Sequence, residues 1–420
     1  MVKVAIVRGE SPEEMVGEAL RLLGGLENIV TGGDAVIKPN MGAWISRLVP
    51  VHVNRWATTK PEIVVALINE LKEAGIMDVA VADGSFLDQD TMEQFEESGM
   101  KTAVEAAGGR VTDLDKGSHV RVEAPGGFAY EIGEPVLNTG NLIDVPVMKT
   151  HVQTKLTLGI KNLKGVVSKN TKRMMHRGDL DRTIAQLYGL VKPRLTVVDG
   201  TLGMEGLGPS VFGRPKKPGL IVAGTDTVAV DTVTATIMGH DPSAVDHIRI
   251  AGELGLGETD LDRIEIVGAT LEEVKCPFEP AQLGAHSLVE SLGFDGVRYH
   301  GWTPGHSGSE CTGCIDTFMN ALTALRDDVP GVRKPLDVVI GSRDMPDDVI
   351  DNVLCYGNCQ AKNRDKGTWL KGCPPELQPS YVTLARMTQS TPSFALALIK
   401  RLIKGERVKP LKEWTQYETQ

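Results

Sequence analysis

The stretch NLIDVPVMKTH, residues 141–151, decides the fold that the sequence predicts. Its apolar run LIDVPVM predicts a β-strand, and Lys149, Thr150 and His151 follow that run directly. In an open α/β sheet, ligands bind at the carboxyl ends of the parallel strands. The stretch therefore predicts a strand that brings a lysine and a histidine to such an edge.

Similar strands recur along residues 1–275, with helical segments between many of them. The other strand-like segments are VKVAIV (2–7), DAVIKPN (34–40), DVAVADG (78–84), LTVVDG (195–200), GLIVAG (219–224) and IEIVG (264–268). In the helical segment 58–75, Thr59 is the expected N-cap, Pro61 suits the first turn and Gly75 ends the helix. This alternation predicts an α/β fold, with a Rossmann-like, mainly parallel sheet domain over residues 1–275.

A basic segment, residues 149–177, contains no Asp or Glu although the whole chain has a formal charge of −10. Its charged and titratable members are Lys149, Lys155, Lys161, Lys164, Lys169, Lys172, Arg173 and Arg177, with His151 and His176. Positive charge that converges at a strand end favours a phosphate or carboxylate ligand, with lysine as a point charge and arginine as a planar fork. A solvated basic helix face is the alternative interpretation.

The basic segment and the polar strand ends together predict an anion site. Lys149, His151 and His176 are the candidate catalytic residues, since lysine and histidine can both bind an anion and transfer protons. The candidate substrate- or anion-binding residues are Lys38, Asn40, Lys161, Lys164, Arg177 and Asp199. The glycines of residues 199–209 suggest a dinucleotide-binding loop, but Pro209 follows where a helix should begin, and we reject that interpretation.

Composition narrows the class of protein. The N-terminus lacks the apolar run of a signal peptide, and no segment approaches the roughly 18 apolar residues of a membrane helix, so we expect a cytoplasmic protein without a membrane span. The net negative charge argues against nucleic-acid binding, which needs a basic face. The expected partner is therefore a small anionic ligand, with a redox partner protein and a homo-oligomer as further options.

Five cysteines in the last third of the chain follow the pattern C-x2-C-x40-C-x3-C-x13-C. Reducing compartments disfavour disulfides, and close cysteine pairs beside glycines are typical of metal sites. We predict Cys311, Cys314, Cys359 and Cys373 as ligands of a [4Fe-4S] cluster, with zinc as the alternative metal and free redox thiols as a third option. Cys355 ends an apolar run, and it is predicted to face a core, as is Cys276.

Near residue 275 the regular alternation of strand and helix patterns gives way to loops rich in glycine and proline and to the cysteines. This change predicts a second, smaller domain. We expect an α+β cysteine-rich cluster-binding domain over residues 276–405, in which a helix opens near Cys314. The remaining residues, 406–420, are predicted to form a C-terminal arm.

Several motifs of the first domain resemble a known family. In order they are IKPNM, ATTKPEIV, VPVMKTH, GIKNLKG, MMHRGDL, LTVVDGTLGMEGLGP and GTDTVAVDTVTATIMGHDP. This set resembles the domain-of-unknown-function 362 family, often described as uncharacterised iron-sulfur proteins. The resemblance implies an α/β fold and a cluster but no settled reaction. The dispersed cysteines depart from the ferredoxin-like run of many relatives, so the ferredoxin module is not carried over.

A more remote similarity to the lactate racemase superfamily implies two-domain α/β enzymes that use Lys and His around a nickel-pincer nucleotide; we carry over no residue from it. Three functions follow as hypotheses. The first is an iron-sulfur enzyme, oxidoreductase-like, that acts on a small anionic substrate with redox or Lewis-acid use of the cluster. The second is a non-redox isomerase, racemase or lyase with a structural metal site. The third is an electron-transfer subunit of a redox complex.

Overall fold

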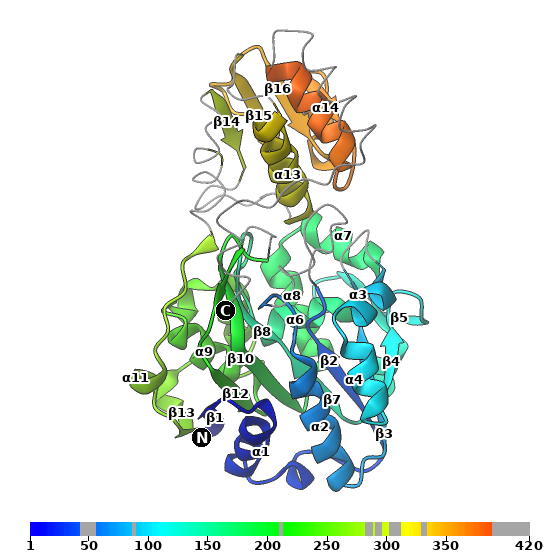
Figure 1. The fold of residues 1–420 in the computed structure, drawn as a ribbon, viewed down its shortest axis with the longest axis vertical. Helices are drawn as coiled ribbons and strands as arrows, with labels where there is room; N and C mark the ends of the chain where they lie inside the picture. Colours follow the sequence, from blue (N-terminus) through cyan, green and yellow to red (C-terminus); the bar gives the residue numbers. More distant parts are fainter. Residues whose placement is uncertain are drawn as a thin grey trace. The chain divides into compact units, whose positions relative to one another are not determined.

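The computed structural model describes residues 1–42, 56–85, 90–209, 213–281, 289, 296–301, 312–328 and 334–388. The chain divides into two compact units, the first of which contains residues 56–205 and 214–279 together with the N-terminal strands (Figure 1). The second contains the described residues after 279 and a short piece around 206–213. Within these described ranges, we find no helix with both the length and the apolar character needed to cross a bilayer.

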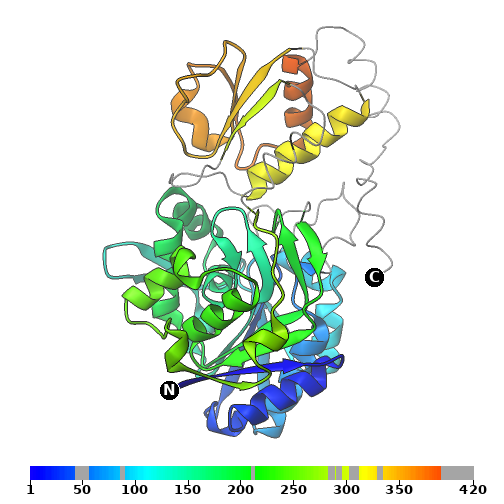
Figure 2. The same cartoon turned by 90° about the vertical axis from the view of Figure 1, so that its left-hand side faces the viewer.

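The first unit is built on an 11-stranded sheet (Figure 2). In spatial order its main strands are β13 (Ile264–Gly268), β1 (Val2–Arg8), β12 (Leu220–Gly224), β10 (Leu195–Gly206), β7 (Leu142–Val145), β2 (Asp34–Pro39), β3 (Asp78–Asp83) and β4 (Arg110–Asp113). The strands β8 (Val147–His151), β9 (Lys155–Thr157) and β11 (Gly213–Lys216) extend it beside β10. Most neighbours are parallel, while β12 is antiparallel to both β1 and β10. The predicted mainly parallel α/β sheet is confirmed.

All seven predicted strand segments are strands, with one difference at the opening stretch. Residues 142–151 form two strands, β7 and β8, which meet at Pro146. Proline has no backbone N–H to donate to a sheet ladder, so it ends regular pairing. Both strands still pair with β10, and β8 carries Lys149 and His151 onward beyond the end of β7.

Helices cover both faces of this sheet. They are α1 (Pro12–Leu22), α2 (Pro61–Glu73), α3 (Thr91–Glu97), α4 (Met100–Ala106), α5 (Glu134–Asn138), α6 (Gly159–Asn162), α7 (Lys169–Arg177), α8 (Leu180–Val191), α9 (Thr227–Ile237), α10 (Asp246–Glu253) and α11 (Leu271–Val274). Short 3-10 turns lie at Leu26–Asn28, Leu163–Val166, Pro242–Ala244 and Leu261–Arg263. A hairpin of β5 (His119–Glu123) and β6 (Ala129–Gly133) stands apart from the main sheet.

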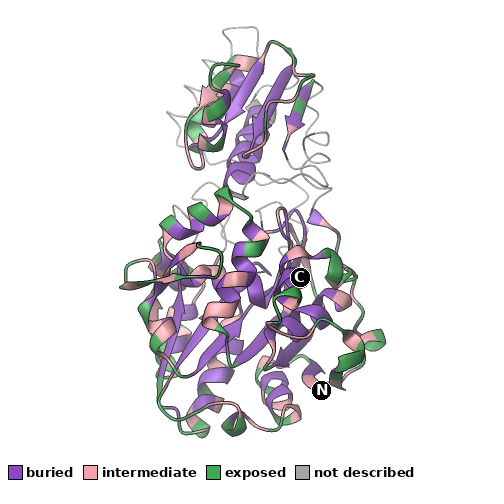
Figure 3. Cartoon of the chain, turned by 180° about the vertical axis from the view of Figure 1, so that it is seen from behind, coloured by how far each residue is buried: buried purple, intermediate pink, exposed green. Residues whose placement is uncertain are grey.

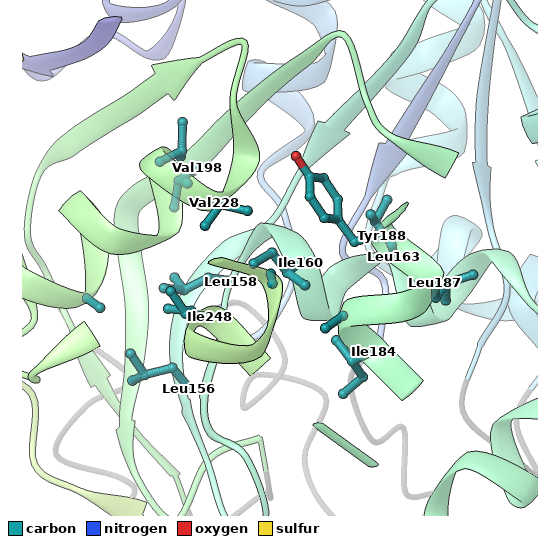
Figure 4. Packing of buried hydrophobic residues seen from close by; sticks show 14 of the residues in the cluster. Leu156, Leu158, Ile160, Leu163, Ile184, Leu187, Tyr188, Val198, Val228 and Ile248 are labelled. Carbon is teal, nitrogen blue, oxygen red and sulfur yellow. The ribbon is translucent and has the colours of Figure 1, made fainter. Parts of the chain in front are cut away.

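Two hydrophobic cores result, one on each face of the sheet. The helices α1, α2 and α4 bury one face, and α6, α8, α9 and α10 bury the other. Figure 3 shows the strands as the buried centre between them. In the second core, Leu158 and Ile160 of the α6 region pack among Ile184, Val228 and Ile248 (Figure 4). This packing fixes the backbone that carries the middle of the basic segment.

The start of α2 differs from the prediction. Lys60, not Thr59, occupies the N-cap, and no side chain caps the helix there. The Thr59 hydroxyl instead accepts a hydrogen bond from the Asn40 N–H at 2.7 Å and donates one to the Val145 carbonyl at 2.7 Å. Pro61 in the first turn and Gly75 after the last turn, with φ 88°, follow the prediction. A tertiary contact between strand ends has replaced the local cap.

The second unit has a four-stranded sheet in the order β14 (Val297–His300), β15 (Leu336–Ile340), β16 (Val353–Tyr356) and β17 (Thr368–Leu370). Every pair among these strands is parallel, so the unit is α/β where α+β was expected. The helices are α13 (Thr312–Asp328) and α14 (Leu377–Thr388), with a 3-10 turn at Asn358–Asn363. The predicted helix near Cys314 is confirmed, and Phe318 packs on Tyr356 with ring centroids 5.7 Å apart.

Candidate functional site

Charged side chains are buried at the carboxyl ends of the central strands in the first unit. Lys38 is the penultimate residue of β2, Asp83 is the last residue of β3, and Lys149 and His151 lie in the last part of β8. All four are at most 3% exposed. Lys161 follows on α6 and is 9% exposed. Burying a charge is costly unless it is paired, so the partners of each lysine decide what that lysine can do.

Two of the buried lysines are paired with carboxylates. The Lys38 Nζ lies 2.8 Å from Asp83 Oδ1, and the Lys172 Nζ lies 3.1 Å from Asp115 Oδ1. Gly165 packs so closely on the first pair that a Cβ there would overlap both Asp83 and Lys38. These two lysines therefore complete internal ion pairs, and Lys38, a predicted anion-binding residue, faces the Asp83 carboxylate.

Lys149 has a different environment. Its Nζ donates to Asn40 Oδ1 at 2.8 Å and to the Ala57 carbonyl at 2.7 Å, with the Gly42 carbonyl at 3.5 Å. In the described part of the chain, no carboxylate lies within ion-pair distance of it. Burial lowers the pKa of Lys149 to about 7, against the opposing influence of the Asp83 carboxylate.

Lys161 resembles Lys149 in charge but has fewer contacts. Over the described ranges, its ammonium group has neither a hydrogen-bond acceptor nor an ion-pair partner. Burial lowers the pKa of Lys161 to about 7, and the neighbouring charge of Lys149 acts in the same direction. Both lysines can therefore gain or lose a proton near neutral pH.

The two candidate catalytic histidines lie among these lysines. Burial, together with the charges of Lys161 and Lys164, holds the pKa of His151 well below its usual value, and the same causes lower the pKa of His176. The His151 Nδ1 accepts the backbone N–H groups of Gln153 and Thr154, so the neutral ring carries its proton on Nε2. The His176 Nε2 contacts the Lys164 Nζ.

Three other predicted residues have different surroundings. Asn40 is buried and contacts Lys149 directly. The Asp199 carboxylate accepts hydrogen bonds from the Lys60 N–H at the start of α2 and from Thr201 of its own strand, β10. Arg177 is exposed at the end of α7. The structure thus gathers Lys149, His151, Lys161, Lys164 and His176, while Asp199 and Arg177 lie outside this group, which we call the basic cluster.

In the second unit, segments that carry three predicted metal ligands meet. A Cβ built on Gly357 would lie 3.2 Å from the Cys314 Sγ, so that sulfur rests against the Gly357 backbone. The Asn358 N–H donates to the Gly372 carbonyl at 2.7 Å, and the Gly372 N–H donates to Asn358 Oδ1 at 3.0 Å. Cys359 and Cys373 directly follow these two bonded residues. Three ligand-bearing segments therefore converge.

The assembled donor set is incomplete. Across the described ranges, no three side chains of His, Cys, Asp or Glu are arranged to hold a metal ion. Cys311 lies outside the described residues. Cys355 lies on the opposite side of the sheet from α13, because Tyr356 is the residue of β16 that contacts Phe318. The Cys355 Sγ donates to the Asn363 carbonyl at 3.3 Å within a small core, and burial raises the pKa of that thiol.

Comparison with known proteins identifies the family. The family model described as "Domain of unknown function (DUF362)" matches residues 35–236. A thylakoid-associated protein of Synechocystis sp. is 30% identical over 279 residues, which cover 62% of this chain and 82% of that protein. The chain belongs to the DUF362 family. The DUF362 match includes every member of the basic cluster and ends before Cys276, the first cysteine.

Two solved structures show weaker similarity. The lactate racemase apoprotein from Thermoanaerobacterium thermosaccharolyticum has a TM-score of 0.35 and 12% identity, covering 92% of this chain and 81% of its own. A protein from Thermotoga maritima has a TM-score of 0.36 and 9% identity, covering 79% and 72% respectively.

Sequence reasoning missed two polar residues beside the basic cluster. Asp144 lies in the apolar run of β7 and is fully buried, and Asn162 on α6 is 5% exposed. The Asn162 Nδ2 donates to Asp144 Oδ1 at 2.8 Å. A carboxylate in the middle of an apolar strand was the available signal for Asp144. Asn162 gave no signal, since its partners lie 18 and 122 residues away.

Proposed function

We propose that this DUF362 protein is an enzyme that binds a small carboxylate or phosphate anion at the basic cluster and transfers a proton there. The observation that supports it is the pair of buried lysines, Lys149 and Lys161, which have no carboxylate partner in the described structure and pKa values of about 7. An anion would supply the negative charge that these lysines lack. Perturbed lysines of this kind are concentrated at functional sites.

The residues suit different parts of this chemistry. Lys161 suits anion binding, because it has no internal acceptor in the described part of the chain. Lys149 suits proton transfer, because a group with a pKa near the working pH exchanges protons most effectively. The neutral ring of His151 offers an Nε2–H donor to the bound anion. This assignment favours an isomerase, racemase or lyase over the other reaction classes.

The second unit supports a second candidate function, the binding of a metal by cysteine. We propose that Cys311, Cys314, Cys359 and Cys373 hold a [4Fe-4S] cluster, with zinc as the alternative. The fit rests on the contact between the Cys314 sulfur and the Gly357 backbone, and on the hydrogen bonds that join the turns before Cys359 and Cys373. A cluster bound there would supply one-electron transfer or a Lewis acid. That role would make the protein oxidoreductase-like or an electron-transfer subunit.

We propose a cytoplasmic protein whose main partner is a small anion, with a redox partner protein or self-association as additions. The description of the Synechocystis relative as thylakoid-associated suggests attachment to a membrane surface as the alternative for this chain.

The proposed reaction can be tested by proton exchange in deuterium oxide. Single enantiomers of 2-hydroxy and 2-amino carboxylates, and a set of sugar phosphates, are incubated with the protein and followed by proton NMR. We expect loss of the signal of a carbon-bound proton next to a carbonyl or carboxylate with wild type and not with Lys149→Met. Absence of exchange throughout the set, together with no binding of phosphate or oxalate by calorimetry, would contradict the proposal.

A further inference from the structure

A chain of side-chain hydrogen bonds leads from a buried carboxylate to Lys149. The Lys149 Nζ donates to Asn40 Oδ1, the Asn40 Nδ2 donates to Asn162 Oδ1, and the Asn162 Nδ2 donates to Asp144 Oδ1, each at 2.8 Å. The four residues come from β8, the end of β2, α6 and β7. All four are buried, with at most 6% exposure. We call this chain the Asp144 relay.

The chemistry of its two ends fixes the direction of the relay. A lysine ammonium group can only donate hydrogen bonds, so the atom of Asn40 that faces it must be the oxygen. The amide group of Asn40 then points at Asn162, whose oxygen must receive it. The amide group of Asn162 points in turn at Asp144 Oδ1 and at the backbone carbonyls of Lys38 and Pro39, and a carbonyl oxygen can only accept. Burial raises the pKa of Asp144 well above its ordinary value, and the carbonyl oxygen of the neutral acid accepts from Asn162 as a carboxylate oxygen does. Each asparagine therefore has one permitted orientation.

The geometry points to Asp144 and Asn162 as positioning residues, which act through Asn40 to keep an amide oxygen against the amine of Lys149. Without the relay, Asn40 could rotate by half a turn and present its NH2 group to the lysine. An NH2 group cannot accept from an ammonium group, so the charged form of Lys149 would lose one of its two short hydrogen bonds. The relay thus favours the protonated lysine that anion binding requires. The role of the relay in anion binding rests on the proposed function, whereas its effect on the titration of Lys149 can be measured without a substrate.

Other groups around Lys149 also influence its protonation. They are Lys38 at the end of β2, Asp83 at the end of β3, Lys161 on α6 and His151 on β8 itself. None of them is a member of the relay. Asp144 itself interacts electrostatically with Lys38 and Asp83, whereas Asn162 carries no charge, so Asn162→Leu separates the influence of the relay from theirs.

The experiment follows the titration of Lys149 by NMR of the full chain labelled with ¹³C at the lysine ε-carbon. Lys149→Arg assigns the signal by its loss, and no substrate is needed. We expect Asp144→Leu and Asn162→Leu each to lower the titration midpoint of Lys149 by about one pH unit, the effect of one lost hydrogen bond to a charged group. Asp144→Asn should restore most of the shift, because its amide oxygen can still accept from Asn162.

The matched control is Asn141→Leu, which removes a buried amide just before the opposite end of β7, where it bonds Thr31 and Asp34. This variant should leave the midpoint unchanged. The relay is overturned if Asp144→Leu and Asn162→Leu leave the midpoint unchanged, or if Asp144→Asn lowers it as far as Asp144→Leu. If a variant does not fold, side-chain amide hydrogen exchange is measured on the wild-type protein instead. Rapid exchange of both the Asn40 and the Asn162 amides would contradict the relay. Failure of the proposed function would leave all these results intact.

Discussion

The buried lysines of this site differ in the group that faces their ammonium nitrogen. Lys38 and Lys172 face carboxylates at 2.8 and 3.1 Å, and they are internal ion pairs. Lys149 faces carbonyl and amide oxygens, and burial lowers its pKa to about 7. Buried lysines of one site therefore differ in chemistry, and the first predictions concern single residues.

Replacing Lys149 by methionine should weaken the binding of phosphate or oxalate by roughly ten- to a hundredfold. The reason is the loss of a charge-assisted contact worth about 1.5–3 kcal/mol. Isothermal titration calorimetry at pH 6.5 measures the change. Lys217→Met, which removes an exposed lysine outside the cluster, should bind as wild type does. Equal affinity of Lys149→Met and wild type would remove Lys149 from the site.

Anion affinity should fall as the pH rises from 6 to 8. Lys149 and Lys161 have pKa values of about 7, well below the ordinary value of 10.5, so they are mostly charged at pH 6 and mostly neutral at pH 8. A bound anion stabilises the charged forms, and binding at pH 7.5 should therefore take up protons. Calorimetry in buffers of different ionisation enthalpy measures this uptake. Proton release on binding would show that these lysines are not the titrating groups.

Single cysteine replacements should divide into two classes. Cys359→Ser should lose metal, while Cys355→Ser and Cys276→Ser should keep it, because the Cys355 sulfur lies in a separate small core. Iron and zinc are counted per chain after anaerobic purification. The ligand set must be redrawn around Cys355 if Cys355→Ser loses the metal and Cys359→Ser retains it. Circular dichroism identifies any variant that is simply unfolded.

At the scale of elements, Gly357 begins the turn after β16 that leads to Cys359, a predicted metal ligand. Gly357 has φ 87°, a left-handed conformation that side chains rarely adopt, and a Cβ there would lie in tight contact with the Cys314 sulfur, at 3.2 Å. The residue therefore meets two requirements, one of conformation and one of close approach. They can be separated with a second glycine of matching conformation.

Gly357→Ala should reduce metal content, whereas Gly75→Ala should not. Gly75 has φ 88°, and no atom lies within 4 Å of the point that a Cβ would occupy there, so it supplies the same backbone strain without the contact. Both variants should lose roughly 1–2 kcal/mol of stability, the cost of a left-handed alanine. Thermal unfolding and metal analysis on the same samples make the comparison. Full metal content in Gly357→Ala would show that the sulfur contact is unimportant for the site.

For the whole molecule, the two proposed sites differ in chemistry and lie in separate units. The basic cluster belongs to the first unit and falls within the DUF362 match, whereas every cysteine follows that match. The proposed acid–base chemistry and the proposed metal binding therefore belong to different parts of one chain, and variants can test them separately.

The full chain purified under argon should be brown, bleach with dithionite and contain about four iron atoms, as expected for a cubane with four cysteine ligands. Metal analysis and electron paramagnetic resonance after reduction check this result. A Cys314→Ser variant should lose the iron and still bind phosphate. A colourless protein with one zinc per chain would replace the iron-sulfur proposal by a structural metal site.

The sequence by itself determined the main strands of the first unit. Apolar runs predicted seven strand segments, and Pro61 and Gly75 predicted the first turn and the end of α2, because burial on a strand and the chemistry of helix ends are written locally in the chain. The acid-free basic segment predicted where positive charge gathers. Thr59 shows the limit of local reasoning, since it had the chemistry of a cap but bonds across the strand ends instead.

Only the tertiary structure decided which side chains face one another. It paired Lys38 with Asp83, left Lys149 facing Asn40, and placed Cys355 in a separate core from Cys314. The two lysine contacts join residues 45 and 109 positions apart in the chain (83 − 38 and 149 − 40). Hydrogen bonds and ion pairs act over a few ångströms in space and leave no period in the chain, so their partners follow from the packing of the elements.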